Sequence, residues 1–534
     1  MFLSKIKNFI TTNAGFLLLL SITVFLLYGK SINFDFTYHD DDILIINNTK
    51  FLSEAKNIPH LFFTSCYLSN NSFYYRPVLN LSFAAETIFF GSSPKIYHFT
   101  NIIFFILALY SSYLLLVKLK FDKNILKFIF LLMAAHPIFV SCIAWIPGRN
   151  DTLLTAFICL AFINFLSFIE QNKTKYLLLH CLFFTLALFT KETMFMLVPI
   201  YIFLICCFNY KISKQQILKN LMILIPVIII YFIFRNSAVA PIDSKEYFLN
   251  YKKYAFNTIS GTMTYIDKFI MPDYIPLMLH NIKIGISIVI MNAAVLFLLV
   301  FMYVKKITDK KNILFAAAWF ILLLLPTFLQ KEYIFLPHRL ILASLGVAVI
   351  ITSLVHYVIT RYPVSKKYLI ALYLMFFSMF LYLSYIQTDK YKKADVYWST
   401  AYIDAPDYHL VLNGLAKVYL SAGDYEQYKN FIYEAYRLSY GDRYIFDITS
   451  ILIHEGNTDE AEKICLNILS DSRNKPFLKF GSMSTLGEIY LKKNNIKKAY
   501  FYTKEAFKIN PYDSNVSEKL EQIKTMLKNR HNAV

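Results

Sequence analysis

The 534-residue sequence is poor in the features that mark several common protein classes. It has only 13 glycines and no long glycine-rich run, so it does not indicate a loop that cradles nucleotide phosphates. Its seven cysteines show neither the spacing of a disulfide framework nor that of a zinc site, and they leave the redox compartment undecided. Charged residues make up only 17% of the chain, whereas 57% is hydrophobic. Because soluble domains use roughly 45–50% apolar residues, a single soluble fold is excluded.

Acidic residues are scarce relative to basic ones, with 35 Asp and Glu against 54 Lys and Arg. The excess lies almost entirely in residues 1–390, which hold 34 basic and 17 acidic residues; residues 391–534 hold 20 and 18. In the first part the basic residues stand between long apolar runs, as expected for charge that flanks membrane helices. We therefore expect membrane lipid as a partner and no nucleic acid.

Apolar runs of the ~20 residues that a bilayer core requires recur through the first 390 residues. The first run could be a signal peptide, but it is long and no small-residue cleavage site follows Leu27, so we interpret it as a retained span. The runs predict about eleven membrane-spanning helices, near residues 9–28, 97–117, 128–145, 151–169, 176–190, 193–208, 217–234, 282–304, 312–330, 338–359 and 368–386.

The basic residues also predict an orientation, because they gather in every second loop. With a cytoplasmic N-terminus, the loops on that side carry eighteen Lys and Arg against three acidic residues, Asp122, Glu170 and Asp309. This is a positive-inside pattern, and an odd number of spans then places the C-terminal part on the exterior side.

Two exterior loops are long, near residues 29–96 and 235–281. Each contains an amphipathic stretch rich in aromatic residues, Phe83–Phe90 in the first and Tyr265–Ile270 in the second, that could lie along the membrane interface. For the second loop, a plain tether between spans is the alternative.

The C-terminal segment contains an internal repeat of amphipathic helix pairs. Leu415, Ala416, Tyr419, Gly423 and Ala435 recur 71 positions later as Leu486, Gly487, Tyr490, Asn494 and Ala506. Two units of about 34 residues with a small insertion account for this offset and resemble the tetratricopeptide repeat, with a degenerate middle unit around Gly456 and Ala461. Stacked pairs of this kind form an α-solenoid whose concave surface binds protein segments; a purely structural cap is the alternative.

The outlier among the charged residues is Tyr38-His39-Asp40-Asp41-Asp42, just beyond the first span. Three adjacent carboxylates repel one another and raise the pKa of at least one, which suits a general base or a cation-assisted site. A solvated acidic turn is the alternative.

Further charged groups fall on the same predicted membrane face. They are Arg76, His136, Arg149, Asp151, Lys191, Glu192, Arg235, His338 and Arg339. Taken singly, each has a plain alternative. Lys191 and Arg235 could extend their long side chains so that the charge lies at the membrane interface, and His136, which precedes a proline, could hydrogen-bond to a kinked backbone. Together, carboxylates and cations at one surface suit a reaction on an anionic lipid-linked substrate, because Arg and Lys bind phosphate and stabilise charge on a departing phosphate.

Seven segments in order along the chain resemble the transmembrane and tetratricopeptide-repeat O-mannosyltransferase-like family, within the GT-C superfamily of polyprenyl-phosphate-sugar glycosyltransferases. They are Y-H-D-D-D-I-L-I-I-N-N (38–48), Y-Y-R-P-V-L-N-L-S-F (74–83), H-P-I-F-V-S-C-I-A-W-I-P-G-R-N-D-T-L (136–153), T-K-E-T (190–193), Y-F-I-F-R (231–235), A-W-F-I-L-L-L-L-P (318–326) and H-R-L-I-L-A-S-L-G (338–346). The sequence departs from the pattern at Ser141 and His338, where the family usually has Glu.

The resemblance implies an all-α fold: a polytopic GT-C-like membrane domain in residues 1–390 and an exterior tetratricopeptide-repeat domain in residues 391–534. It implies an enzyme that moves a sugar, with inversion, from a polyprenyl phosphate to an acceptor hydroxyl of a protein or glycan, with protein Ser/Thr favoured. Asp40 and Asp41 are the expected catalytic pair, because aligning Asn48 with the motif's Asn favours that register.

The resemblance also implies roles for the other charged groups. The expected donor-phosphate ligands are Arg149, Lys191, Arg235 and Arg339, and the expected supporting residues are Asn48, Arg76, His136, Asp151 and Glu192. No metal is expected to be required, although a divalent cation could bind at Asp40, Asp41 and Asp42.

Two other functions remain open at this point. One is a ligase or polymerase of lipid-linked glycans, and the other is a non-catalytic membrane scaffold whose repeats recruit proteins. The bias toward Ile, Lys, Asn and Phe suggests an AT-rich bacterial genome, so we expect the inner membrane with the repeats in the periplasm. In a eukaryote the exterior side would be the lumen of the endoplasmic reticulum.

Overall fold

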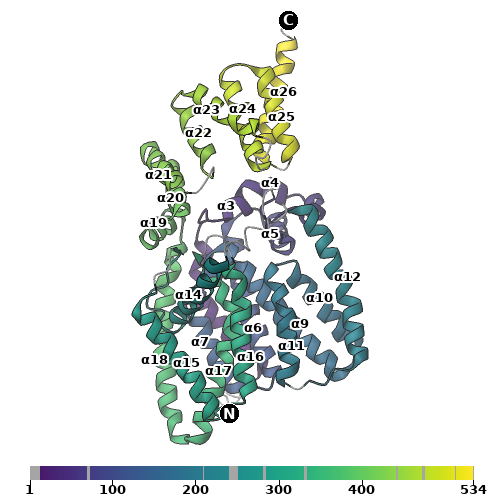
Figure 1. Ribbon diagram of the computed structural model, residues 1–534, viewed down its shortest axis with the longest axis vertical. Coiled ribbons are helices and arrows are strands. Elements are labelled where there is room, and N and C mark those ends of the chain that lie inside the picture. The colour runs from purple at the N-terminus through teal and green to yellow at the C-terminus, as the bar shows by residue number, and fades with distance from the viewer. Residues whose placement is uncertain are drawn as a thin grey trace. The chain divides into compact units, whose positions relative to one another are not determined.

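A computed structural model of the chain describes residues 12–68, 73–208, 210–239, 251–280, 284–329, 334–439, 443–471, 476–511 and 513–532 (Figure 1). It is 82% helical and has nearly no strands, so the predicted all-α fold is confirmed. Its described strands, β1 (Leu279–His280) and β2 (Ile334–Phe335), pair antiparallel.

The chain forms two compact units. Unit 1 comprises residues 1–37, 93–232 and 243–397, and unit 2 comprises residues 38–92, 233–242 and 398–534. The first long loop thus shares a unit with the C-terminal segment. The predicted boundary near residue 390 stays a prediction.

Each predicted span corresponds to helical structure. The helices are α2 (Asn13–Tyr28), α6 (Pro94–Lys118), α7 (Lys123–Ala135) with α8 (Ser141–Ala144), α9 (Arg149–Gln171), α10 (Thr174–Leu188), α11 (Leu197–Phe208), α12 (Lys214–Ala238), α15 (Ile286–Val304), α16 (Lys310–Phe328), α17 (Leu340–Arg361) and α18 (Lys366–Thr388). Residues 9–11, 282–283 and 330 of the predicted spans lie outside the described part of the chain.

Fewer helices are long enough to cross a membrane than the sequence predicts. Eight helices in the described ranges have the length and hydropathy to do so, and a ninth forms if α7 and residues 137–144, bent by 59°, make one span. The other two, α10 and residues 192–208, are apolar but too short. The 15 residues of α10 extend only ~22 Å at 1.5 Å per residue, less than the ~30 Å bilayer core. The chain is a multi-pass integral membrane protein.

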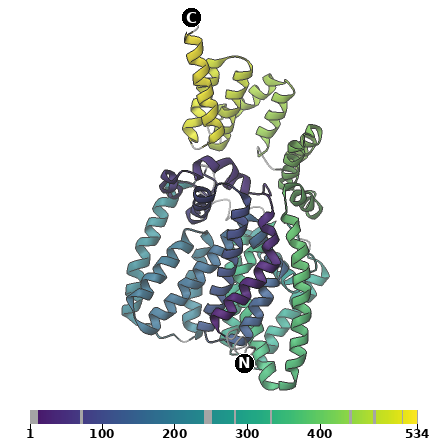
Figure 2. The same cartoon turned by 180° about the vertical axis from the view of Figure 1, so that it is seen from behind.

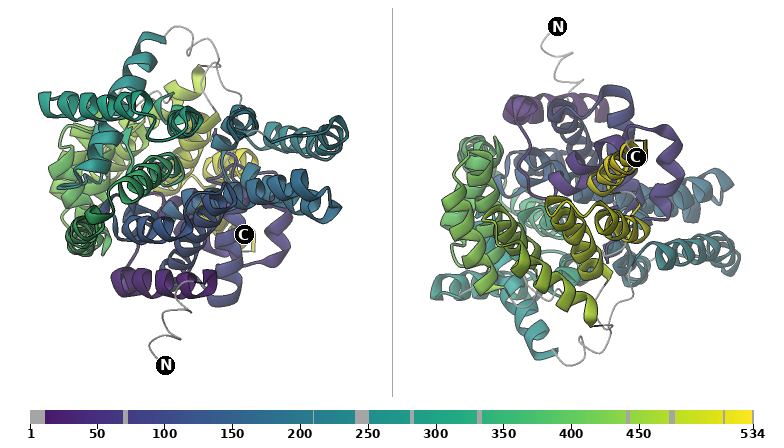
Figure 3. Two further views of the ribbon diagram at one scale, coloured as in Figure 1. Left: turned by 90° about the horizontal axis from the view of Figure 1, so that it is seen from below. Right: turned by 90° about the horizontal axis from the view of Figure 1, so that it is seen from above.

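Helix α9 is the most enclosed span of unit 1. In its most apolar 18-residue stretch 83% is buried inside the protein, whereas the corresponding value for α15 is 6%. Helices α6, α10 and α17 pack on α9, and α2 packs on α6 and α7 (Figure 2). Viewed end-on, α10 and α12 lie at one side of unit 1, away from α2 and α18 (Figure 3). The exposed apolar side chains of outer helices, such as Phe297 at 71%, suit contact with lipid.

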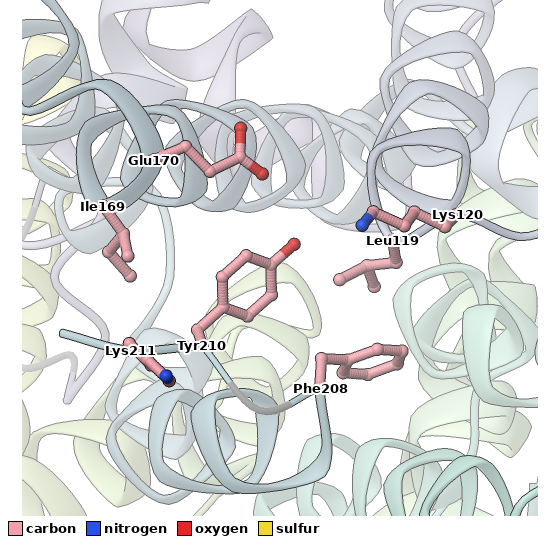
Figure 4. A pocket seen from close by; sticks show the side chains of 7 residues that line it. All are labelled: Leu119, Lys120, Ile169, Glu170, Phe208, Tyr210 and Lys211. Carbon is pink, nitrogen blue, oxygen red and sulfur yellow. The ribbon is translucent and has the colours of Figure 1, made fainter.

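A cavity of about 320 Å³ lies at the C-terminal ends of α6 and α9 (Figure 4). Its lining residues are Leu119, Lys120, Ile169, Glu170, Phe208, Tyr210 and Lys211. Glu170 pairs with Lys118 at 2.5 Å. Because Arg149 and Asp151 lie at the opposite end of α9, ~30 Å away along the helix, this cavity is separate from the predicted site.

Unit 2 combines short helices of the first long loop with the C-terminal helices. The loop forms α3 (Asp41–Leu44), α4 (Thr49–Leu52) and α5 (Pro77–Phe90). The C-terminal helices are α19 (Ala394–Asp404), α20 (His409–Ser421), α21 (Tyr425–Leu438), α22 (Ile445–His454), α23 (Thr458–Ser470), α24 (Pro476–Lys492), α25 (Ile496–Ile509) and α26 (Ser514–Asn532).

The C-terminal helices pack as consecutive pairs, α20 with α21, α22 with α23 and α24 with α25. The turn within each pair has a residue in the left-handed region: Gly423 (φ +81°), Gly456 (φ +86°) and Asn494 (φ +56°). Gly423 and Asn494 are corresponding positions of the sequence repeat, which explains why glycine or asparagine stands there. That these pairs are tetratricopeptide repeats stays a prediction.

Gly346 lets α16 and α17 approach closely, because a Cβ atom there would lie 2.4 Å from the backbone oxygen of Ala316. We predict that Gly346→Ala destabilises the protein by about 1–3 kcal/mol, since the backbone has to shift. Gly29→Ala is the control, because no described atom lies within 4 Å of its added Cβ. Thermal unfolding in detergent measures both variants, and equal midpoints would contradict the prediction.

Candidate active site

The structure brings several of the predicted site residues together in two groups, one in each unit. Unit 1 holds a cationic group around Asp151, and unit 2 holds the acidic turn, defined as residues 38–42.

The cationic group is built on an ion pair between Lys191 and Asp151. The Lys191 Nζ atom donates to both carboxylate oxygens of Asp151, at 2.8 and 2.7 Å. Both residues are buried, with 9% and 6% exposed. Asp151 stands in the first turn of α9, where a negative charge is favoured by the helix dipole, and Lys191 follows α10. The pair therefore ties the start of α9 to the end of α10.

His338 and Arg339 approach the same carboxylate from a short 3₁₀ turn before α17, where Arg339 adds a positive charge and His338 does so when it is protonated. The His338 Nε2 atom lies 3.8 Å from an Asp151 oxygen, and Arg339 also interacts electrostatically with Asp151. The ring centroid of Trp145 lies 4.9 Å from that of His338. Arg339 is partly exposed, so it is the cation of this group with the better access to a ligand. The departure from the family's Glu at position 338 thus makes the group more cationic.

Arg149 is fully buried. Its Nε atom donates to Asn101 Oδ1 at 2.8 Å, and its Nη2 atom donates to the Tyr97 carbonyl at 2.8 Å and to the Thr100 hydroxyl at 3.0 Å. All three acceptors lie on α6, so Arg149 anchors the start of α9 to α6. Its contact with a donor phosphate stays a prediction, and the geometry favours a positioning role.

Asn101 is a site residue that the sequence reasoning missed. Its amide nitrogen donates to the carbonyls of Ile143, Trp145 and Ile146 at 3.1–3.2 Å, while its oxygen accepts from Arg149. It therefore fixes the segment that leads into α9. Its position inside the apolar run 97–117 could have identified it from the sequence, because a polar group within a membrane is costly and usually has a function.

Gly148 lets the same segment fold tightly. A Cβ atom at this position would lie 2.2 Å from the backbone oxygen of Ser141. The backbone of the G-R-N-D motif therefore rests directly on α8, and this close approach explains the glycine.

His136 lies in the bend between α7 and α8 and is buried. Its Nδ1 atom accepts from the Ile138 backbone N–H at 3.2 Å, so its Nε2 atom carries the proton and donates to the Phe269 carbonyl at 2.9 Å. These contacts match the kinked-backbone alternative that the sequence left open.

Two predicted residues lie at helix ends. Glu192 begins a 3₁₀ turn directly after Lys191, and Arg235 lies in the last turn of α12, where a cation complements the helix dipole. Both are partly buried. Their roles stay predictions.

The acidic turn has an unusual backbone. Tyr38 and Asp40 adopt φ values of +56° and +66°, in the left-handed region that non-glycine residues rarely occupy. Such strain is often found at functional sites, where the surrounding structure holds it. Asp41 begins α3 and is fully buried, whereas Asp40 is partly exposed. The Asn48 amide donates to the carbonyl of Ile43, the residue that follows the turn, at 2.6 Å.

The surroundings of Asp40 change its proton affinity. Burial raises the pKa of Asp40; the charge of His39 lowers it, Asp42 raises it and Arg76 lowers it. Arg76 also lies over the Tyr74 ring, 4.6 Å from its centroid. A carboxylate with a raised pKa is a stronger base than ordinary Asp, as proton abstraction from a hydroxyl requires.

In the described ranges, no group of three or more His, Cys, Asp or Glu side chains is arranged to hold a metal ion. Binding of a divalent cation at Asp40, Asp41 and Asp42 stays a prediction, and no step proposed below depends on it.

Removing one partner of the Lys191–Asp151 pair leaves a buried charge uncompensated. We predict that Lys191→Met destabilises the protein by about 3–5 kcal/mol, and that adding Asp151→Leu restores part of this loss. Lys118→Met is the control, because its pair with Glu170 is more exposed and is worth about 1 kcal/mol or less. Unfolding midpoints in detergent test this, and equal losses for the two lysine variants would contradict it.

Part of the chain matches a protein-family model. Residues 77–234 match the model described as dolichyl-phosphate-mannose-protein mannosyltransferase. The matched segment contains α6 and α9 with Arg149, Asp151 and Lys191.

Two relatives, each called protein O-mannosyl-transferase TMTC1, are similar to part of the chain. The human protein is 30% identical over 196 residues, which is 34% of this chain and 22% of the relative. The mouse protein is 28% identical over 197 residues, or 34% and 21%. The aligned region thus spans about a fifth of the relatives' length. No solved structure matches the chain. The predicted resemblance is confirmed: part of this helical membrane protein matches an O-mannosyltransferase family model and is similar to two O-mannosyl-transferases.

Proposed function

We propose that this protein is a membrane glycosyltransferase that moves a sugar from a polyprenyl phosphate to a hydroxyl group of a protein Ser or Thr. The observation that carries the proposal is the family match over residues 77–234, which includes the three residues at the centre of the buried charge network. The family description names a lipid-linked mannose donor and a protein acceptor, and this chain is proposed to use the same classes.

In the proposed reaction the acceptor oxygen forms a bond to the anomeric carbon of the sugar. The bond between that carbon and the phosphate oxygen breaks, and the lipid phosphate leaves with the electron pair. The hydroxyl proton passes to a carboxylate of the acidic turn. Attack from the face opposite the phosphate inverts the configuration at the anomeric carbon.

Asp40 is the proposed base. It is partly exposed and its pKa is raised, whereas Asp41 is fully buried at the start of α3. Asp41 is therefore proposed to hold the turn, and Asn48 is proposed to support it through its hydrogen bond to Ile43.

The cationic group of unit 1 is proposed to neutralise the departing phosphate. Arg339 is partly exposed and can bind phosphate oxygens bidentately. Lys191 supplies a point charge that Asp151 holds in place, and Arg149 positions both through the start of α9. Arg235 is proposed as a further phosphate ligand.

The charge of the loops favours an orientation for this reaction. Lys and Arg gather in alternate loops, which suits a cytoplasmic N-terminus and transfer on the exterior face. That face would be periplasmic in a bacterium and lumenal in the endoplasmic reticulum.

The acidic turn can be tested by replacing both catalytic candidates. We predict that Asp40→Asn with Asp41→Asn lowers sugar transfer from polyprenyl-phosphate mannose to a Ser/Thr peptide by about 10²–10⁴-fold, the usual contribution of a general base. Glu54→Gln is the control, because it removes an exposed carboxylate from the same loop. Transfer is measured in membranes with matched protein levels. Activity of the double variant equal to that of the control would disprove the assigned base.

The raised pKa of Asp40 predicts the pH dependence. The proposed base accepts a proton only when it is deprotonated, so kcat/KM should fall as the pH is lowered through the pKa of Asp40. This fall, the acidic limb of the pH profile, should lie above the ~3.9 of an ordinary Asp. Because Arg76 lowers the pKa of Asp40, Arg76→Met moves this acidic limb to higher pH. Arg437→Met, which alters an exposed pair on α21, leaves it in place. An acidic limb that Arg76→Met does not move would contradict the prediction.

A further inference from the structure

The acidic turn and the C-terminal helices lie in the same unit, although they are more than 350 positions apart in sequence. Two side chains of the C-terminal segment contact the turn: Trp398 of α19 and Lys417 of α20. The elements can be found by their labels in Figure 1.

Trp398 supports the turn through His39. The two ring centroids are 5.6 Å apart with an interplanar angle of 69°, and Trp398 is 5% exposed. Trp398 also packs against the backbone of α20 at Gly414, where a Cβ atom would lie 2.1 Å from the indole ring. Only glycine allows this approach, so α20 fixes the indole and the indole fixes His39.

Lys417 lies three residues after Gly414 and therefore on the same face of α20. Its Nζ atom is 3.5 Å from an oxygen of Asp42. The Asp42 side chain is only 11% exposed. Lys417 also lowers the pKa of Asp447 on α22, which burial raises. The Lys417 ammonium group therefore interacts electrostatically with a carboxylate of the acidic turn, Asp42, and with a carboxylate of the next helix pair, Asp447.

The turn needs this support because its backbone is strained. Tyr38 and Asp40, on either side of His39, hold left-handed φ values, and residues in that region stay there only when their surroundings fix them. His39 and Asp42, which contact Trp398 and Lys417 of the C-terminal helices, flank Asp40 and Asp41.

We infer that Lys417 and Trp398 are positioning residues that hold the acidic turn in the conformation that presents Asp40. The C-terminal helices then contribute to sugar transfer itself, in addition to any protein segment that they bind. This inference rests on the proposed role of Asp40 as the base.

The charges around Asp40 give the direction of the expected effect. His39, Asp42 and Arg76 shift the pKa of Asp40 electrostatically, and burial together with the charge of Asp40 in turn raises the pKa of the nearby Tyr67 phenol. Asp42 raises the pKa of Asp40, and Lys417 offsets the charge of Asp42. Removing the ammonium group therefore raises the pKa of Asp40 further.

The experiment compares Lys417→Met, Lys417→Arg and the control Lys429→Met in the full-length protein in lipid nanodiscs. Lys429 pairs with Glu426 and Glu455 within the same C-terminal segment. Hydrogen–deuterium exchange of residues 38–48 reports the conformation of the turn, and the pH profile of transfer from polyprenyl-phosphate mannose reports the base.

For Lys417→Met we expect exchange in residues 38–48 to rise about threefold or more, since the ion pair is lost. The acidic limb of kcat should move up by about half a pH unit. Lys417→Arg should restore both values, and Lys429→Met should change neither. If Lys417→Met folds poorly, Trp398→Phe provides the second test, because loosening the contact with His39 should also raise exchange.

Unchanged exchange in both Lys417→Met and Trp398→Phe overturns the inference. Increased exchange with an unmoved acidic limb also overturns it, because the helices would then support the turn without acting on the base. The proposed function fails separately, if the double Asp40 and Asp41 variant keeps its activity.

Discussion

The buried ion pair between Lys191 and Asp151 is the interaction on which the arrangement of unit 1 depends. A carboxylate among apolar helices is tolerated only when it is paired, and here both of its oxygens accept from one ammonium group. The pair joins α9 to the end of α10, and the hydrogen bonds of Arg149 join α9 to α6. Helix α9 is thereby fixed at its N-terminal end, where the segment H-P…G-R-N-D and the turn before α17 converge on one carboxylate.

The two groups of charged residues have different physical character. In unit 1, Arg149, Asp151 and Lys191 are buried and are held by contacts between helices, as suits a preorganised binding site. In unit 2 the carboxylates lie on a strained turn held by side chains from distant helices. In the proposed reaction, residues of unit 1 bind the phosphate and a carboxylate of unit 2 accepts the proton.

Hydropathy predicted where the helices lie in the sequence, because an apolar run can be recognised from neighbouring residues alone. It did not predict that α10 and residues 192–208 are too short to span, because one long apolar region is divided by the turn at Thr190 to Glu192. Charge patterns singled out Arg149, Asp151 and Lys191, but they could not give the burial of these side chains, because burial depends on packing between distant helices. A contact of Arg149 with the donor phosphate stays a prediction. Asn101 was missed because a single amide within an apolar run forms no repeating sequence pattern. Lys417 and Asp42 could not be paired, since nothing local links residues 375 positions apart.

The most direct test of the central claim is the choice of donor. The purified protein in proteoliposomes is given a Ser/Thr acceptor peptide with either polyprenyl-phosphate mannose or nucleotide-activated mannose, and labelled sugar on the peptide is counted. The account predicts transfer from the lipid-linked donor alone, because the cationic group is proposed to receive a lipid phosphate and no nucleotide site is indicated. Direct transfer from the nucleotide sugar, or no transfer from the lipid donor by a folded protein, would contradict it.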